Sequence, residues 1–462
     1  MERELYQSEQ FGTAHSVECG LQFHAVERPP TWRQCPYTLT YLLPDHEPVA
    51  IELIGLHHWA VSRNLANPRV ITPQLLHWSS LFNPRFFNAV ATGRVSPLTR
   101  LCWATPDSAP SHGSMSRFWL ESMMFLAAVT LSAAVVQSRY SSGTIASKYD
   151  RLWEAGVLAS AGVVPELQPL DLLECVRELA ALSKLDPIDR LITISRNYMA
   201  ALSVLAPLHR ELVMMSEAQP PIAYADRFGF VSLLRESCGS GLQAIVVYGS
   251  SVSSESFADY DVLLVTNDAE ACLRKLAGQS PRWHDKELNL GIYTPEEMIV
   301  MQCLSGDNLA DYGVCLWGST PVVHKSVPEL LTRNFSFGII RQRQQLGMLS
   351  RAVSDPIPED GDDRQNLHEY FVKIPANVAK GTLGALGERW PKERVQEWML
   401  REIGFDAVAE QRRVMNGGSI PALASSALAT GNVLTALNEK VRHENPWLGV
   451  VEQVEEHKSE WD

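Results

Sequence analysis

The stretch from Gly241 to Thr266 constrains the fold more than any other, because its pattern is typical of two strands joined by a polar turn. Its first apolar run, 245–248, ends at a Gly-Ser-Ser sequence, where glycine frees the backbone to bend. A serine-rich connection leads to a second apolar run, which opens with Asp259 and Asp261 on either side of a tyrosine. Side chains alternate along a strand, so these two carboxylates share one face.

The pairing of Asp259 with Asp261 carries a chemical implication. Two carboxylates a few ångströms apart repel each other unless a cation lies between them. Carboxylate oxygens are also the ligands that hard divalent cations such as Mg²⁺ prefer. The sequence therefore predicts a divalent metal site at the start of the second strand.

Composition limits the classes of protein to which the chain can belong. Its 462 residues predict two to four domains at roughly 100 to 200 residues each. A hydrophobic fraction of 45% is enough to bury sizeable cores. The net charge of -13 provides no general basic surface, which argues against a long nucleic-acid partner.

The cysteines and the apolar segments indicate a cytoplasmic protein. Eight cysteines are scattered without CxxC or zinc-ligand spacing, which is typical of buried thiols in a reducing compartment. Residues 1–11 carry charges of both signs and no apolar signal segment. The apolar run 122–136 is too short to span a bilayer, so we expect a buried helix there and no membrane partner.

The order of predicted elements indicates an α+β fold in three domains. Residues 1–218 are expected to form a mostly helical domain that starts with an irregular segment, residues 219–330 an α/β domain with a small mixed sheet, and residues 331–462 a helical domain. Further strands are expected at 49–55 and 286–294, an extended pair at 312–323, and helices at 189–217, 336–353, 365–387, 392–403 and 422–439.

The N-terminal half leaves two interpretations open. A strand at 49–55 followed by helices to about 156 repeats the layout of 286–294 and the helices after it. This half is therefore either a degenerate duplicate that lacks its own Gly-Ser and Asp-x-Asp, or a separate helical domain for acceptor binding or dimerisation.

The central motifs resemble those of a known superfamily. The sequence Tyr248-Gly249-Ser250, eight intervening residues and then Asp-x-Asp-Val resembles the signature of the polymerase-β nucleotidyltransferase superfamily. Downstream, KELNLGIYTPEEM and YGVCLWGS resemble elements of its minimal and aminoglycoside-type members. The resemblance covers about residues 225 to 325.

This resemblance implies a Mg²⁺-dependent nucleotidyltransferase that moves a nucleoside monophosphate from an NTP, with ATP favoured, to a hydroxyl of a small-molecule acceptor and releases pyrophosphate. Two Mg²⁺ ions, or Mn²⁺ in their place, about 3.5 to 4 Å apart would stabilise the attacking and leaving oxygens. Asp259 and Asp261 would hold them. Gly249 would let the backbone approach the triphosphate, and Ser250 would bind phosphate oxygens, with Ser251 a weaker candidate.

The third carboxylate of the superfamily has two candidate positions. Alignment by the TPEE sequence places it at Asn289, whereas alignment as in aminoglycoside-modifying members places it at Glu287. These residues share a strand face. We expect Glu287 to act as metal ligand or general base, because an asparagine can do neither well.

Asn289 at that position instead would favour a catalytically weak, nucleotide-binding regulatory or scaffold protein of the same fold. Nucleotidylation of a protein or RNA is a further alternative. In related enzymes a helical domain often supplies a lysine to the triphosphate. Here Tyr370, Lys373 and Lys380 have the spacing of one helix face, which makes Lys380 the candidate; a solvated helix is the other interpretation.

Overall fold

The computed structural model describes residues 112–138, 164–181, 186–206, 212–218, 226–255, 257–354 and 361–442, four short N-terminal strands and single positions between 148 and 159. Contacts divide the chain into two compact units, one of residues 120–326 and one of residues 1–119 with 327–462. The second division is close to the predicted boundary after 330. The first differs from the predicted boundary after 218, because elements that precede 219 pack against the central sheet.

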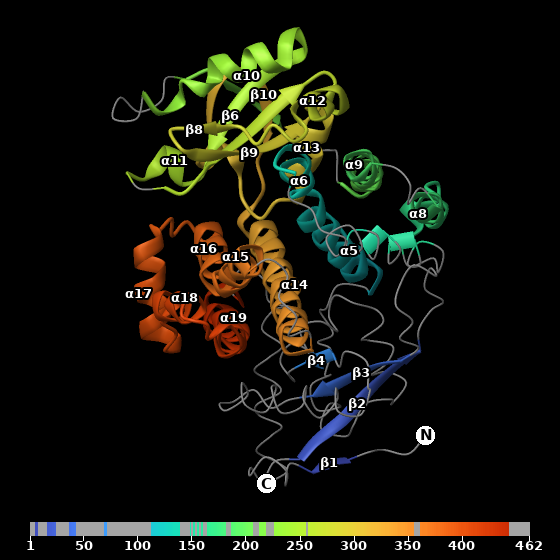
Figure 1. Ribbon diagram of the computed structural model, residues 1–462, viewed down its shortest axis with the longest axis vertical. Helices are drawn as coiled ribbons and strands as arrows, with labels where there is room; N and C mark the ends of the chain where they lie inside the picture. Colours follow the sequence, from blue (N-terminus) through green and yellow to red (C-terminus); the bar gives the residue numbers. More distant parts are fainter. Residues whose placement is uncertain are drawn as a thin grey trace. The chain divides into compact units, whose positions relative to one another are not determined.

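A six-stranded mixed sheet is the centre of the 120–326 unit (Figure 1). The strand order is β5-β10-β6-β7-β9-β8. Strands β7 and β9 are parallel, and the other neighbours are antiparallel. This sheet and the surrounding helices confirm the predicted α+β class. The strands are β5 (Leu212–Ser216), β6 (Leu242–Tyr248), β7 (Tyr260–Thr266), β8 (Arg282–Trp283), β9 (Lys286–Tyr293) and β10 (Val314–Val323).

Alternation of side chains fixes the register of the central strands. One face of β7 carries Tyr260, Val262 and Leu264, all buried, whereas Asp261 on the other face is half-buried. The Tyr260 ring packs edge-on against Phe228, Phe230 and Phe257, with centroid distances of 4.8 to 6.3 Å. A slip of one residue would turn these apolar side chains out of the core, so packing holds both aspartates on the opposite face.

Eight α-helices are described in and beside this unit: α5 (His112–Ala128), α6 (Leu131–Val136), α8 (Leu172–Ala181), α9 (Pro187–Leu205), α10 (Phe230–Cys238), α11 (Ser250–Ser253), α12 (Ala269–Leu276) and α13 (Pro295–Leu304). The apolar run 122–136 is buried, as predicted, but a turn at Val129-Thr130 divides it. Helix α6 is fastened to β9, because Gln137 donates to the Leu288 carbonyl at 3.0 Å.

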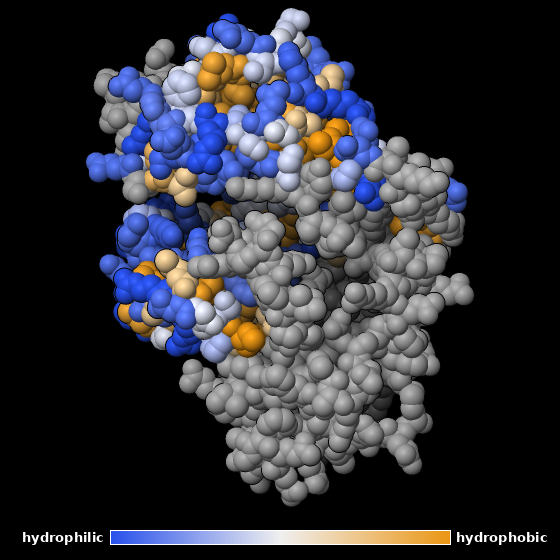
Figure 2. All heavy atoms as spheres, in the orientation of Figure 1, coloured by the Kyte–Doolittle hydropathy of each residue, from blue (hydrophilic) through white to orange (hydrophobic). Residues whose placement is uncertain are grey.

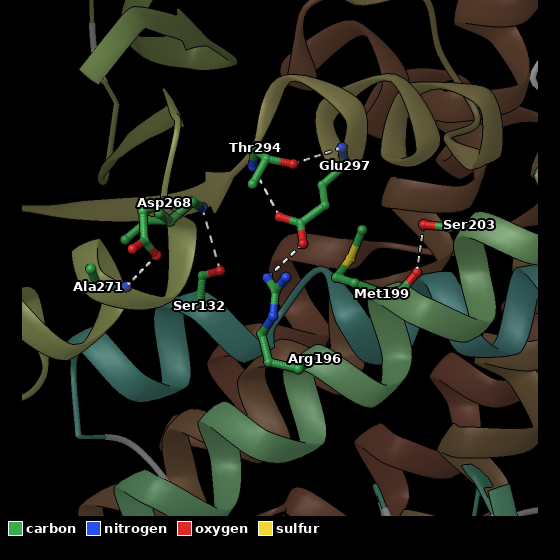
Figure 3. Close-up of polar contacts among 9 residues, drawn as sticks. Ser132, Arg196, Met199, Ser203, Asp268, Ala271, Thr294 and Glu297 are labelled. Carbon is green, nitrogen blue, oxygen red and sulfur yellow. Dashed lines mark hydrogen bonds and ion pairs between the residues drawn. The ribbon is translucent and has the colours of Figure 1, made fainter. Parts of the chain in front are cut away.

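Helix α13 begins with a capping box after β9 (Figure 3). Thr294 Oγ1 accepts from the Glu297 amide at 3.2 Å, and Glu297 Oε2 accepts from the Thr294 amide at 2.9 Å. Arg196 reaches from α9 to the other oxygen of Glu297, 2.5 Å away (Figure 3). Helix α13 therefore starts at Pro295, and the cap fixes where β9 ends.

Two predicted elements near the sheet are wrong. The helix expected over 189–217 ends at Leu205, where Ala206 turns extended and Pro207 follows in the sequence; residues 212–216 form the edge strand β5. The extended pair expected over 312–323 is one strand, β10, interrupted by a bulge between Cys315 and Trp317. Gly318 (φ +74) makes the bulge possible, because any Cβ there would overlap the Gln243 carbonyl.

The first 48 residues are not wholly irregular. They contain β1 (Leu5–Gln7), β2 (Ser16–His24) and β3 (Tyr37–Leu42), which form a sheet with β4 (Arg69–Ile71) in the order β1-β2-β3-β4. Apolar residues at every second position of β2 match the period of a strand. The predicted strand at 49–55, on which the duplication interpretation depends, lies outside the described residues.

The C-terminal segment is helical, as predicted: α14 (Val327–Ser354), α15 (Gly361–Val372), α16 (Ile374–Ala385), α17 (Lys392–Ile403), α18 (Ala407–Met415) and α19 (Ser419–Arg442). The single helix expected over 365–387 is wrong, because the chain breaks at Lys373. Pro375 has no amide hydrogen and its ring would clash with a preceding carbonyl, so α15 cannot continue through it.

Helix α19 is long and apolar enough to cross a membrane by length and composition. However, 61% of its apolar window is buried, and it packs against α14, α16 and α18. A core helix of a globular unit has the same properties, and hydrophilic residues cover most of the described surface visible in Figure 2. These observations are compatible with a soluble protein.

Candidate active site

The turn after β6 brings the backbone of Gly249 against the side chain of Asp261. Gly249 has φ +78, and a Cβ added to it would lie 2.5 Å from Asp261 Oδ2. Only glycine tolerates both the backbone conformation and this close approach. The short helix α11 follows at once, so the β6–α11 turn lies beside the carboxylate.

Asp259, Asp261 and Asn289 come together on one edge of the sheet. Asp261 is level with Asn289 in the parallel ladder between β7 and β9. Asn289 Nδ2 donates a hydrogen bond of 2.5 Å to Asp259 Oδ2. All three side chains are half-buried. The position opposite Asp261 is therefore held by an amide, and this amide is already bonded to the other aspartate.

Glu287 lies two residues before Asn289 on β9 and shares its face. Continuing the register of Tyr260 with Leu288 by one residue places Glu287 level with Asp259. On its other side it pairs with Arg282 of β8. Both candidates for the third carboxylate position thus lie along the same edge, Asn289 beside Asp261 and Glu287 further out, beside Asp259.

Two cations hold the loop that leads from α11 to Asp259. The Arg227 guanidinium donates to the carbonyls of Ser251, Ser254 and Glu255 at 2.7 to 3.1 Å. Lys286 Nζ donates to the Phe257 carbonyl and lies 4.3 Å from the centre of that ring. The loop is therefore fixed at both ends, which limits the positions that Asp259 can take.

The three serines of the turn differ in what their hydroxyl groups do. Ser251 is fully buried, and its hydroxyl donates to the Tyr248 carbonyl at 3.2 Å. Ser253 donates to the Gly249 carbonyl at 3.1 Å. Ser250 is half-exposed at the first position of α11. Its hydroxyl is the one best placed for a ligand, whereas Ser251 stabilises the turn.

A second group of polar side chains adjoins the aspartates, and sequence reasoning missed it. Tyr248 pairs with Asp261 across β6 and β7, and its ring lies 6.0 Å from that of Tyr312 in an edge-to-face contact. Tyr312 lies close to Asp307, an exposed carboxylate between α13 and η6 (Leu309–Asp311). Both tyrosines belong to sequence motifs, but the sequence does not show that they meet; the pairing of β6 with β10 brings them together.

Burial and negative charge keep both tyrosines protonated. Burial, followed by the charge of Asp261, holds the pKa of Tyr248 well above its usual range. Burial and the neighbouring Asp307 do the same to the pKa of Tyr312. Both phenols are therefore hydrogen-bond donors over the physiological pH range, and the carboxylates around them are negatively charged.

The donor set fits a hard divalent cation. Asp259 and Asp261 supply carboxylate oxygens, and rotation of the Asn289 amide would turn its oxygen towards Asp259. Within the described ranges, no group of three or more His, Cys, Asp or Glu side chains is arranged around a metal position. Mg²⁺ is commonly bound by one or two carboxylates together with substrate phosphates, so two aspartates suit a cation that arrives with its nucleotide.

Lys380, the lysine expected at the triphosphate, belongs to the other unit. It lies on α16 and is exposed. Tyr370 lies on α15, and Lys373 is the residue between the two helices. The three residues are thus not on one continuous helix face.

No protein-family model, curated protein or solved structure matches this chain.

Proposed function

We propose that this protein is a Mg²⁺-dependent nucleotidyltransferase acting on a hydroxyl of a small, cytoplasmic acceptor molecule. One observation carries the proposal: the backbone of Gly249 lies against Asp261 on the edge where Asp259 and the β9 side chains meet. A close backbone approach beside paired carboxylates is what binding of a metal-nucleotide complex requires. Strands β6, β7 and β9 are neighbours in the sheet, so the two strands of the central motif lie next to the strand that carries Glu287 and Asn289.

In this proposal Asp259 and Asp261 hold the cation, which when bound neutralises the triphosphate and the leaving pyrophosphate. The Ser250 amide and hydroxyl bind phosphate oxygens, and Gly249 leaves room for them. Arg227 and Lys286 act indirectly, because their contacts fix the loop that carries Asp259. Lys380 adds a positive charge for the triphosphate, as the resemblance implies.

In this proposal the acceptor binds on the side of Tyr248, Tyr312 and Asp307. Two protonated phenols and an exposed carboxylate can orient hydroxyl groups by hydrogen bonds. Glu287 is the proton acceptor for the attacking hydroxyl, because Asn289 cannot take a proton at neutral pH. The electronegative surroundings favour a neutral or cationic acceptor over an acidic one.

A second candidate function rests on Asn289. Asn289 lies opposite Asp261 and donates to Asp259. Alignment by the TPEE sequence would give this residue the position of the third carboxylate in the superfamily. This observation favours a protein that binds a metal-nucleotide complex and transfers slowly or not at all. Nucleotidylation of a protein or RNA has the same chemistry and differs in its acceptor.

Labelled NTPs incubated with the protein, Mg²⁺ and a metabolite extract test the first proposal against the second. We expect label to move onto small molecules, and Asp259→Asn and Asp261→Asn each to abolish transfer. Asp285→Asn, an exposed carboxylate in the β8–β9 turn, is the matched control. Retained nucleotide binding without transfer would support the regulatory role, and full turnover by either aspartate variant would refute the metal site.

A further inference from the structure

The fold places two free cysteines in contact at the end of β6 and β7 that lies opposite the candidate site. Cys238 is the last residue of α10 and Cys272 lies within α12, 34 residues further along the chain. Their sulfur atoms are 3.3 Å apart. The scattered spacing in the sequence predicts no disulfide, so this pair exists only because α10 and α12 pack together on the sheet.

We propose that Cys238 and Cys272 form a reversible disulfide when the protein meets a peroxide oxidant. The sulfur atoms need to approach by only about 1.3 Å to reach bonding distance. Such a bond would close a loop of chain that contains Gly249, Asp259 and Asp261. The inference does not rest on the proposed function, because it concerns the thiols alone.

The two thiols have different roles. Cys238 is half-exposed, so a small oxidant can reach it, whereas Cys272 is 5% exposed. The hydrogen bond from Cys272, and then the charge of Lys275, lower the pKa of Cys238, while the same pairing raises the pKa of Cys272. A thiolate is the nucleophile in such reactions, so Cys238 is the attacking sulfur and Cys272 the resolving one.

The chemistry balances with one hydrogen peroxide. The Cys238 thiolate attacks one peroxide oxygen, the O–O bond breaks, and the leaving hydroxide takes a proton to become water. The resulting sulfenic acid is attacked by Cys272, the S–O bond breaks, and a second water leaves. Two thiols are oxidised to a disulfide, and the peroxide is reduced to two waters.

The native packing is compatible with a disulfide between Cys238 and Cys272 that stabilises the fold. Leu242 and Thr266 already pair near the two ends of the enclosed segment, through the ladder between β6 and β7. A covalent link between the helices before and after this hairpin removes conformational freedom from the unfolded chain. We therefore expect the oxidised protein to unfold at a higher temperature than the reduced protein.

Peptide mapping of the full-length wild-type protein tests the inference. Both cysteines, and no others, fall in one tryptic peptide, 236–274, which contains no internal Lys or Arg. After peroxide treatment and alkylation with N-ethylmaleimide, we expect this peptide unalkylated and two hydrogen atoms lighter. Reduction with dithiothreitol should restore two alkylation sites. A peptide that still takes two alkyl groups, at a dose that oxidises a free-cysteine standard, overturns the proposal.

Variants test the order of events. With Cys272→Ser, Cys238 should stop at the sulfenic acid and be labelled by dimedone. With Cys238→Ser, Cys272 should stay unlabelled, and Cys175→Ser, which removes another half-exposed thiol, should leave the disulfide unchanged. Dimedone labelling of Cys272 in place of Cys238 would overturn the assigned roles. Mapping of the wild type decides the main point even where a variant does not fold.

Discussion

At the scale of single residues, Asn289 decides what the candidate site can do. Register places it opposite Asp261, and its amide donates to Asp259. The sequence predicts that 287 and 289 share a face, because strand side chains alternate. It could not predict which of the two is level with Asp261, since that depends on how β7 and β9 are aligned in space.

Replacing Asn289 with Asp should make the site depend on metal. Without Mg²⁺ the free energy of unfolding should fall by about 2 kcal/mol, because a hydrogen bond to a charged group becomes a contact between carboxylates. Mg²⁺ should restore it, and transfer should rise at least roughly tenfold once a carboxylate can act there as base or ligand. Urea unfolding with and without MgCl₂ and a turnover assay measure both.

Asn267→Asp is the control for this substitution. Asn267 follows β7 at its opposite end and is exposed. It should lose little stability and gain no dependence on Mg²⁺. An Asn289→Asp protein that is equally stable with and without the cation would argue against a metal site on this edge.

Gly249→Ala should weaken binding of the Mg²⁺-nucleotide complex in addition to lowering stability. Gly249 and Gly239 have nearly the same backbone angles, φ 78 and ψ -154 against φ 75 and ψ -160. Alanine at either position should cost about 1 to 3 kcal/mol of strain. Only at Gly249 does the new Cβ meet Asp261, since nothing lies within 4 Å at Gly239.

The pair of alanine variants thus separates strain from displacement of the carboxylate. Isothermal titration with MgATP should give weaker affinity for Gly249→Ala and nearly wild-type affinity for Gly239→Ala. Equal affinities in the two variants would mean that Asp261 does not contribute to binding.

At the scale of elements, local sequence predicts many of the segments that form strands and helices. Pairing with a distant strand decides the conformation of segments that have no clear local pattern. Proline at 295 followed by two glutamates predicts the start of α13, and alternation predicts β7, because both signals lie in neighbouring residues. Strand β5 was missed because Leu212–Ser216 has no clear period and owes its conformation to β10. The helix predicted over 365–387 breaks at Lys373, because Pro375 cannot continue α15.

A contact between α18 and α19 predicts how the stability of the protein depends on pH. Glu410 on α18 is buried, and burial raises the pKa of its carboxyl despite Arg413 and a hydrogen bond from Ser425 on α19. The folded protein therefore keeps a proton that the unfolded chain releases as the pH rises above the ordinary glutamate value. Stability falls as the pH rises through that interval.

Glu410→Gln should remove the loss of stability that the wild type shows as the pH rises. The free energy of unfolding of the variant should exceed that of the wild type at pH 7, and the difference should vanish below about pH 4, where glutamate is protonated in both states. Urea unfolding at several pH values measures it, with the exposed Glu397→Gln as control. A variant less stable than the wild type at pH 7 would mean that pairing with Arg413 outweighs burial.

At the scale of the whole molecule, the chain is two compact units, and the paired aspartates lie in only one of them. The unit of residues 120–326 contains the entire six-stranded sheet, whereas Lys380 lies on α16 of the other unit. The resemblance found in the sequence implies that Lys380 contributes to nucleotide binding. Composition and length predict that several units exist, but they do not predict that the first and last segments of the chain form one together.

Lys380→Met should therefore weaken nucleotide binding without changing the aspartate site. Loss of one partly screened positive charge near a triphosphate should cost about 1 kcal/mol, which raises the KM for the NTP several-fold and leaves kcat nearly unchanged. Lys373→Met is the matched control, because Lys373 lies on the same segment and faces Glu369 at 3.9 Å. Identical KM values for the two variants would remove Lys380 from the site.

The groups available to bind Mg²⁺ predict how the cation and the nucleotide change the stability and the hydrogen exchange of each unit. Because two carboxylates and an amide hold a cation weakly without phosphate ligands, Mg²⁺ alone should hardly stabilise the protein, whereas MgATP at 100 times its dissociation constant should add about 2.7 kcal/mol. Hydrogen exchange should slow at 248–262 and 286–293, and at 374–385 if Lys380 binds the triphosphate. Exchange that slows equally with Mg²⁺ alone would indicate a preformed metal site, and no change with MgATP would contradict the proposed function.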